Sequence, residues 1–297
     1  MSSSAKSSGS AAPIRTAACL IIGDEILGGK TQDTNGHFFA RYCFDLGITL
    51  KRIEVIPDEE DDIIEAVRRM SDKYDFVITS GGIGPTHDDM TYASIAKAFN
   101  LPLKLTEEGF RRMRQLYKPK QANVEFDWDT PSEILEAKLR MLKLPIDESR
   151  DESEQVLFPD DELWIPLSCV NRNVYIFPGI PLLQQKMLNG LKPRIAKRVS
   201  NPEHEKGMHR VTIATPMYES EIAGYLTKLS HKLAPHETKV GSYPSWGKKR
   251  NTVVLTGRDL KYMEGLVHDI EEAVRGKRIY SDDEDPFDAE GDSPSDD

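Results

Sequence analysis

Apolar residues in the first hundred positions follow two patterns that alternate along the chain. Short apolar or alternating runs, typical of β-strands, occur at 17–23, 49–56 and 76–80. Apolar residues spaced by three or four positions, typical of amphipathic helices, occur at 35–46, 61–74 and 87–99. Gly47 and Pro102 supply helix stop signals. The pattern therefore predicts a β-α-β-α-β-α order.

Such an order is typical of a parallel sheet with helices on both faces. The predicted fold class is α/β, a three-layer α/β/α sandwich with a mostly parallel sheet. In open sheets of this kind the ligand lies beyond the carboxyl ends of the strands. The loops that follow Ile22 and Thr79 are therefore the first places to look for chemistry.

The rest of the chain divides into an extension of this sheet and a second, smaller pattern. The extension has predicted helices at 107–117, 132–144 and 181–191, strands at 164–170 and 174–177, and an exposed acidic loop at 146–155. The smaller pattern reads β-α-β-β-α at 209–214, 218–229, 239–243, 251–256 and 259–274. We therefore expect an α/β domain over 16–200 and a small α+β subdomain over 205–280. The ends, 1–15 and 281–297, are expected to be disordered because they are polar and nearly without apolar residues.

The charge of the chain is concentrated at its end. The 297 residues carry a net charge of −10, but the last sixteen contain nine acids and no base. Without them 39 basic residues face 40 acidic ones. A broad basic surface for nucleic acid is therefore not expected.

Cysteine usage and the N-terminus bear on location. Cys19, Cys43 and Cys169 are far apart and lack metal-ligand spacing, which favours a reducing compartment. Six serines among the first ten residues, without an apolar stretch, do not form a secretory signal. The shortage of acids there is a feature of mitochondrial transit peptides, but without an amphipathic pattern a cytoplasmic location is favoured. No apolar run reaches the roughly 18 residues of a membrane helix, so no membrane partner is expected.

The first chemical motif is SGGIGPTHDD at 80–89, between a predicted strand and a predicted helix. Its glycines let the backbone approach a ligand, and the N-terminus of the helix that follows favours an anion such as phosphate. Asp88 and Asp89 are expected in the first helical turn, and carboxylates beside a phosphate indicate a divalent cation. The alternative is a glycine turn in which an aspartate caps the helix. The spacing fits neither standard nucleotide-binding fingerprint.

Two further motifs also lie between a strand and a helix. The stretch GDEILGG at 23–29, followed by Asp33 and Asn35, places Asp24 and Glu25 at the carboxyl edge of the sheet. The alternative is a turn with exposed acids. The stretch FPGIP at 177–181 has a glycine that permits a tight turn, and the alternative is a simple Pro-Gly turn.

Together these three motifs resemble the molybdopterin-binding domain superfamily. Two more stretches, RNVYIFPGIP at 172–181 and GSYPSWG at 241–247, are similar to the N-terminal half of eukaryotic FAD synthase and to the N-terminal domain of competence-damage-inducible protein A. The resemblance covers about residues 16–276. It implies hydrolysis of a dinucleotide pyrophosphate bond, with a divalent cation (Mg²⁺, Mn²⁺ or Co²⁺) as cofactor. The adenylyltransferase half of FAD synthase has no counterpart here, so formation of FAD from FMN and ATP is not expected.

The resemblance also implies roles for individual residues. The implied catalytic residues are Asp88 and Asp89, and the implied metal ligands are Asp24, Glu25 and Asp88. The implied substrate-binding residues are Gly81, Gly82, Gly84, Thr86, Asp33, Asn35, Arg140, Pro178, Gly179 and Trp246. Arg140 reaches a phosphate in this interpretation, or else is an exposed arginine on a solvated helix face. Trp246, like Tyr243, stacks on a flavin or adenine ring, although Tyr243 fits core packing equally well.

The most concrete functional hypothesis is hydrolysis of FAD to FMN and AMP. The first alternative is adenylylation of molybdopterin in molybdenum cofactor biosynthesis, which uses the same loops. The second is a non-catalytic protein that binds a nucleotide or a pterin. In each case the partner is a small molecule, and the sequence leaves open whether the chain forms a homo-oligomer.

Overall fold

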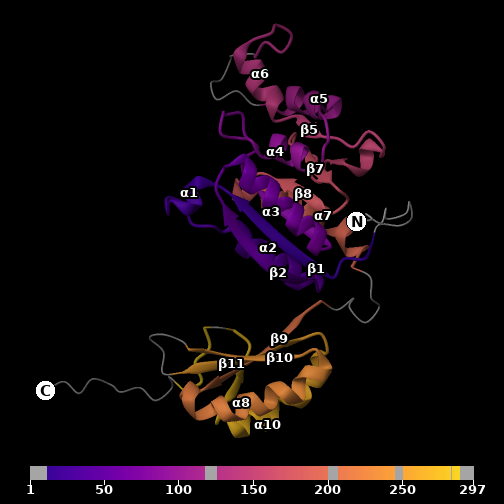
Figure 1. The fold of residues 1–297 in the computed structure, drawn as a ribbon. Coiled ribbons are helices and arrows are strands. Elements are labelled where there is room, and N and C mark those ends of the chain that lie inside the picture. Colours follow the sequence, from indigo (N-terminus) through magenta and orange to yellow (C-terminus); the bar gives the residue numbers. More distant parts are fainter. Residues whose placement is uncertain (1–11, 118–125, 200–206, 245–249, 282, 288–297) are drawn as a thin grey trace, which may run out of the picture. The chain divides into compact units, whose positions relative to one another are not determined.

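A computed structural model describes residues 12–117, 126–199, 207–244, 250–281 and 283–287. The chain divides into two compact units, Met1–Glu205 and Lys206–Asp297 (Figure 1). In the part of the chain that the structure describes, no helix is long and apolar enough to cross a membrane.

The first unit is built on a six-stranded sheet. In spatial order its strands are β2 (Thr49–Ile56), β1 (Thr16–Ile22), β3 (Phe76–Ser80), β8 (Val174–Phe177), β7 (Leu167–Val170) and β6 (Val156–Leu157). The first four are parallel to one another, whereas β7 and β6 each run antiparallel to the preceding strand. The mostly parallel sheet that the sequence predicts is confirmed.

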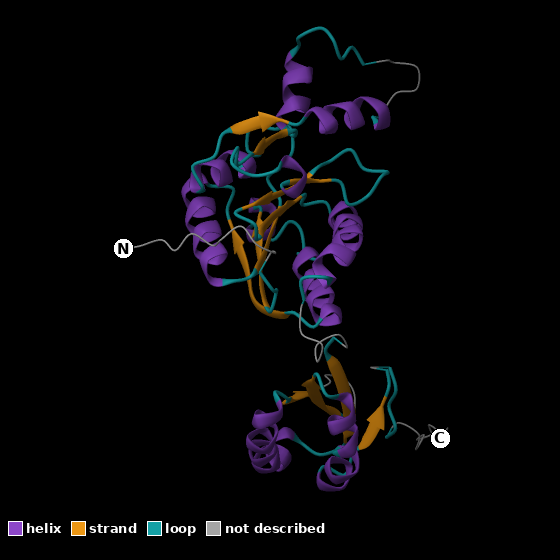
Figure 2. Ribbon diagram, turned by 90° about the vertical axis from the view of Figure 1, so that its right-hand side faces the viewer, coloured by secondary structure: helices purple, strands orange, loops and turns teal. Residues whose placement is uncertain are grey.

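Helices cover both faces of this sheet (Figure 2). On one face, α3 (Glu60–Lys73) and α4 (Thr91–Ala98) pack on Ala18, Leu20 and Ile22 of β1. On the other, α2 (Asn35–Leu46) and α7 (Pro181–Ala196) pack on the alternate residues of the same strand. Because β1 is buried on both faces, it reads as a continuous apolar run rather than an alternating one. The α/β/α layering is therefore as predicted.

The helix predicted at 87–99 begins four residues later, at Thr91. Asp88 and Asp89 lie in the loop before it, so their expected place in the first helical turn is wrong. The Asp89 carboxylate accepts hydrogen bonds from the backbone N–H groups of Gly84 and Thr86, at 2.6 and 2.8 Å. These bonds stabilise a non-helical turn over this stretch.

The helix predicted at 132–144 is also shorter than expected. The observed helix, α6 (Glu133–Arg140), ends at Arg140. Strand β5 (Lys143–Pro145) follows it and pairs antiparallel with β4 (Leu103–Leu105). Leu142 and Leu144 are buried while Lys143 is exposed, which is the alternation of a strand. In the sequence, helix α5 (Glu107–Leu116) comes between β4 and α6. The predicted 146–155 loop contains a short 3₁₀ turn, η1 (Glu152–Glu154).

The second unit is an antiparallel sheet with helices. Its strands lie in the order β10 (Lys239–Pro244), β11 (Asn251–Gly257), β9 (His209–Thr215) and β12 (Lys277–Ile279). Helices α8 (Glu219–Leu233), α9 (Leu260–Gly265) and α10 (Val267–Ala273) supply its apolar core together with the sheet, and η3 (Ala234–His236) follows α8. The predicted helix at 259–274 is two helices that divide at Leu266. Strand β12 was not predicted.

Short stretches next to the chain ends make specific contacts. Ile14 is buried in the first unit, and its backbone N–H donates to the Arg198 carbonyl at 2.8 Å. In the second unit the Asp285 carboxylate lies 3.3 Å from Nε of Arg250. Residues 12–15 and 283–287 thus have defined positions, although the sequence places them in disordered ends. Residues 1–11 and 288–297 lie outside the described residues.

Candidate functional site

The three motif loops meet at one edge of the first unit's sheet. Strands β1 and β3 are parallel neighbours in which Ile21 pairs with Ser80, so the loops that follow them emerge side by side. Strand β8 pairs with β3 on its other side, and Ser80 pairs there with Phe177. This is the carboxyl edge where ligands bind in open α/β sheets. The first loop begins with the short helix α1 (Asp24–Leu27).

Two glycines allow these loops to approach closely. Gly81 has φ +116°, and a Cβ there would lie 2.0 Å from the Ile22 carbonyl oxygen. A Cβ at residue 179 would lie only 3.3 Å from the Cα of Gly81. Larger residues at these positions would force the three loops apart, so the glycines shape the site whatever ligand it takes.

Asn35 and Asp33 hold the loops from behind. The Asn35 amide donates to Ser80 Oγ at 2.9 Å and to the Gly179 carbonyl at 2.7 Å. The Asp33 carboxylate accepts from the backbone N–H groups of Asn35 and Gly36 at the start of α2. Both residues line a small cavity of about 50 Å³. Their observed contacts are with the protein's own loops.

Asp89 and Arg140 hold the glycine loop in shape. Besides its two backbone bonds, Asp89 accepts a hydrogen bond from Thr86 Oγ1 at 2.6 Å. The Arg140 guanidinium donates to the carbonyl oxygens of Pro85 and Thr86, at 3.0 and 2.8 Å. Of the loop N–H groups expected to hold a phosphate, those of Gly84 and Thr86 therefore already bond to Asp89.

A group of carboxylates borders the same loops. Asp58, which follows β2, accepts a hydrogen bond from the Asp24 backbone N–H at 3.0 Å. Burial raises the pKa of Asp58, and repulsion from Asp24, Glu25 and Asp88 raises it further. The side chain of Asp88 is 66% exposed. Hydrogen bonding, from Thr86 and then from the backbone, lowers the pKa of Asp88, although the one Thr86 hydroxyl proton reaches only one of Asp88 and Asp89 at a time.

The predicted metal ligands, Asp24, Glu25 and Asp88, lie near one another but do not form a complete metal site. Within the described residues, no three His, Cys, Asp or Glu side chains lie close enough together to hold a metal ion. The sequence analysis did not single out Asp58. It could have been found, because it too follows a strand of the parallel sheet and so reaches the same edge.

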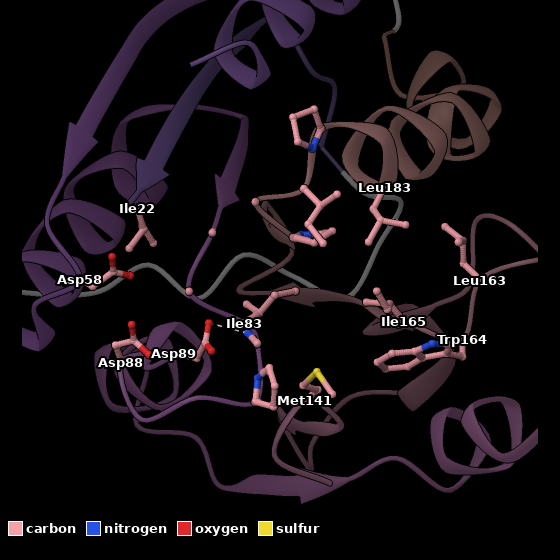
Figure 3. A pocket seen from close by; sticks show the side chains of 18 of the residues that line it. Ile22, Asp58, Ile83, Asp88, Asp89, Met141, Leu163, Trp164, Ile165 and Leu183 are labelled. Carbon is pink, nitrogen blue, oxygen red and sulfur yellow. Dashed lines mark hydrogen bonds between the residues drawn. The ribbon is translucent and has the colours of Figure 1, made fainter. Parts of the chain in front are cut away.

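A cavity of about 840 Å³ opens beside these loops. Glu25, Asp58, Asp88, Asp89 and the glycine loop border it on one side. Figure 3 shows the opposite side, which is apolar and includes Leu163, Trp164, Ile165 and Leu183, with Met141 and Ile83 between. Pro178 and Gly179 also line it. The predicted strand at 164–170 begins only at Leu167, so Trp164 and Ile165 lie in the loop before β7, and no motif in the sequence marks the 163–165 segment as part of the site.

The remaining predicted ring-stacking residues belong to the second unit. Trp246 lies outside the described residues. Tyr243, at the end of β10, is exposed. All residues that line the cavity lie between Ile22 and Leu183, within the first unit.

Comparison with known proteins agrees with this architecture. Residues 18–197 match the family described as "Probable molybdopterin binding domain", and residues 207–283 match "FAD synthase, middle domain". The chain belongs to the molybdopterin-binding domain family. The expected resemblance to that superfamily and to FAD synthase is confirmed.

Individual relatives extend the comparison. The chain is 29% identical over 277 residues to a "Probable FAD synthase" of Caenorhabditis elegans and 30% identical over 279 residues to that of Caenorhabditis briggsae. In both cases the match covers 90% of this chain and 51% of the relative, so the chain spans about half the length of these curated relatives. A solved structure of the protein CinA from Thermoplasma acidophilum, with unknown function, is 29% identical and has a TM-score of 0.49. That match covers 61% of this chain and 98% of the CinA chain.

Proposed function

We propose that the chain hydrolyses the pyrophosphate bond of a dinucleotide, and that FAD, cleaved to FMN and AMP, is its substrate. The observation that carries the proposal is the two-sided cavity, with carboxylates and a glycine loop on one side and an apolar wall on the other. A dinucleotide has a matching division into a charged pyrophosphate and planar rings. The cavity of about 840 Å³ lies in the upper part of the roughly 300–1,000 Å³ range of small-molecule sites. The similarity to the FAD synthase middle domain and to two probable FAD synthases supports FAD in particular.

The cluster of carboxylates beside the cavity is suited to a divalent cation. Asp24, Glu25, Asp58 and Asp88 repel one another enough to affect the pKa of Asp58, and a substrate pyrophosphate would add negative charge. Mg²⁺ commonly uses only one or two protein carboxylates and completes its shell with water and phosphate oxygens. An incomplete protein ligand set is therefore compatible with Mg²⁺, Mn²⁺ or Co²⁺. Such an ion would neutralise phosphate charge and polarise a water molecule.

The glycine loop positions the pyrophosphate, and Asp88 acts as the base. The pyrophosphate lies against the Gly81–Ile83 part of the loop, next to the 84–86 turn that Asp89 and Arg140 hold. Asp88, exposed beside the cavity, orients a water molecule and accepts its proton as the new P–O bond forms. The water oxygen bonds to one phosphorus as the bridging P–O bond breaks. The products are FMN and AMP, and the bridging oxygen stays with the departing phosphate.

Product analysis tests the reaction. The purified chain is incubated with FAD and Mg²⁺, Mn²⁺ or Co²⁺, and FMN and AMP are separated by chromatography. Equimolar FMN and AMP support the proposal, and intact FAD with all three metals contradicts it.

A second candidate is adenylylation of molybdopterin, because residues 18–197 match the molybdopterin-binding family. A parallel incubation with molybdopterin and ATP distinguishes it. Formation of an adenylylated pterin together with intact FAD would favour this second candidate.

A further inference from the structure

The apolar side of the cavity is formed largely by one segment between two strands of the sheet. Leu163, Trp164 and Ile165 lie between β6 and β7, far in sequence from the glycine loop. Figure 3 shows the Trp164 ring extending toward Met141 across the cavity. Trp164 is only half-buried, although tryptophan is a large apolar side chain. A half-buried indole on a cavity wall offers a flat surface to a ligand.

The residues that precede this segment contact the neighbouring helices. Lys186 of α7 pairs with Glu162 at 2.8 Å. Arg112 of α5 lies 4.3 Å from the Phe158 ring centroid and 3.6 Å from the Asp161 carboxylate. Contacts therefore hold the segment from two sides.

A glycine adds a third restraint. Gly190 in α7 lets the Pro159 carbonyl approach so closely that a Cβ at residue 190 would lie 1.9 Å from that oxygen. Ile165 packs against both apolar cores of the unit, and Leu163 packs against one of them. The residues on either side of Trp164 thus have packing contacts of their own without a ligand, which leaves less ordering for a ligand to impose.

We infer that Trp164, with Met141 and Ile165, forms a preformed subsite that stacks on a planar aromatic ring of the substrate. This inference rests on the proposed function for its place beside the pyrophosphate, and adds to it the part of the substrate that the cavity selects. A substrate with a ring at one end of its pyrophosphate would be bound more tightly than pyrophosphate alone. The flavin ring and the adenine ring share the required chemistry, and experiment distinguishes them.

Product binding tests the subsite without requiring turnover. Dissociation constants for FMN, AMP and inorganic pyrophosphate are measured by calorimetry with Mg²⁺ present, for the wild type, Trp164→Ala and Trp164→Phe. Loss of base-aromatic stacking usually weakens binding by an order of magnitude, so Trp164→Ala should weaken FMN or AMP by about tenfold. Trp164→Phe should recover most of the affinity, and pyrophosphate should bind equally to all three proteins. The nucleotide whose binding is weakened by Trp164→Ala identifies the ring that stacks on Trp164.

Trp128→Phe is the matched control. Trp128 lies in an aromatic cluster with Phe110, Tyr117 and Phe126, and does not line the cavity. Its replacement should leave both nucleotides unaffected. Equal affinities in the wild type and Trp164→Ala, or no binding of either nucleotide to the wild type, would overturn the inference. Trp164-dependent binding without FAD cleavage would instead uphold the subsite and refute the hydrolysis.

Discussion

Asp88 and Asp89 are adjacent in the sequence but differ in their surroundings. Asp88 is exposed and ionised beside the cavity, whereas both Asp89 carboxylate oxygens accept hydrogen bonds from the glycine loop. The two acids therefore separate into a proposed catalytic base and a residue that positions the loop. The family resemblance alone implies a catalytic role for both, because a motif records residue types and not the bonds that each side chain makes.

Substitution should separate these roles. Asp88→Ala should reduce turnover by roughly two or more orders of magnitude, the usual scale for a general base, without changing the melting temperature. Asp89→Ala should reduce turnover and also lower the melting temperature, because it removes three hydrogen bonds that shape the loop. Steady-state kinetics and thermal unfolding of both variants measure this. Equal melting temperatures for the two variants would show that Asp89 does not support the loop.

At the scale of elements, β2 and α3 are joined by a charged group. Arg69 of α3 bonds to Glu54 of β2 at 2.7 Å and to Glu65 of its own helix at 2.7 Å. Arg52 also pairs with Glu54, at 2.8 Å. Hydrogen bonding to Arg69 is the main cause that lowers the pKa of Glu54.

Stability should therefore depend on pH through Glu54. A carboxylate whose pKa is lower in the folded state adds stability above its unfolded pKa of about 4.3, and this stability is lost as the pH falls through the folded value. Glu54→Gln should cost about 0.2–1 kcal/mol at pH 7 and progressively less below pH 4, since the pair is partly exposed. Urea unfolding of the wild type and Glu54→Gln at pH 7 and below pH 4 measures the difference in free energy of unfolding. A substitution at the exposed Glu152 serves as the control. A cost that does not depend on pH would contradict this account.

Elements with clear local patterns could be predicted from sequence. The strands at 49–56, 76–80 and 174–177 and the helix at 35–46 have the predicted bounds, because periodicity, glycine stops and burial agree there. The errors occur where distant or side-chain contacts decide the structure. Asp89 replaces the first turn of α4 by a loop, and pairing with β4 makes a strand of Lys143–Pro145.

The same distinction applies to the site. The three motif loops could be predicted because their strands are neighbours in a parallel sheet. The apolar wall could not, because the segment that carries Trp164 is positioned by contacts of Asp161 and Glu162 with α5 and α7 and by packing of Ile165 on both apolar cores, which no local pattern reveals.

At the scale of the molecule, the second unit depends on part of the acidic tail. Asp285 is 10% exposed and Arg250, its partner at 3.3 Å, is 2% exposed. The acidic composition alone predicts that removal of residues 282–297 is nearly neutral. The observed pair predicts otherwise.

Two truncations test this difference. A chain that ends at Ser281 should lose about 1–3 kcal/mol of stability, the scale for removing a partner of a buried charged group. A chain that ends at Phe287 should keep it, and Asp285→Asn should give an intermediate loss. Calorimetric unfolding shows whether the change falls in the transition of the second unit. Equal stability of the two truncated chains would contradict a structural role for Asp285.

The proposed function requires metal-dependent cleavage of FAD by the carboxylates and glycine loop of the first unit. The most direct measurement is the rate of FMN and AMP release from FAD by the wild-type chain and by Asp88→Ala, each with Mg²⁺ and with EDTA. We predict stoichiometric FMN and AMP from the wild type with Mg²⁺, loss of this activity in EDTA, and a decrease of roughly two or more orders of magnitude in Asp88→Ala. Full cleavage in EDTA, or wild-type turnover in Asp88→Ala, would contradict the assigned site.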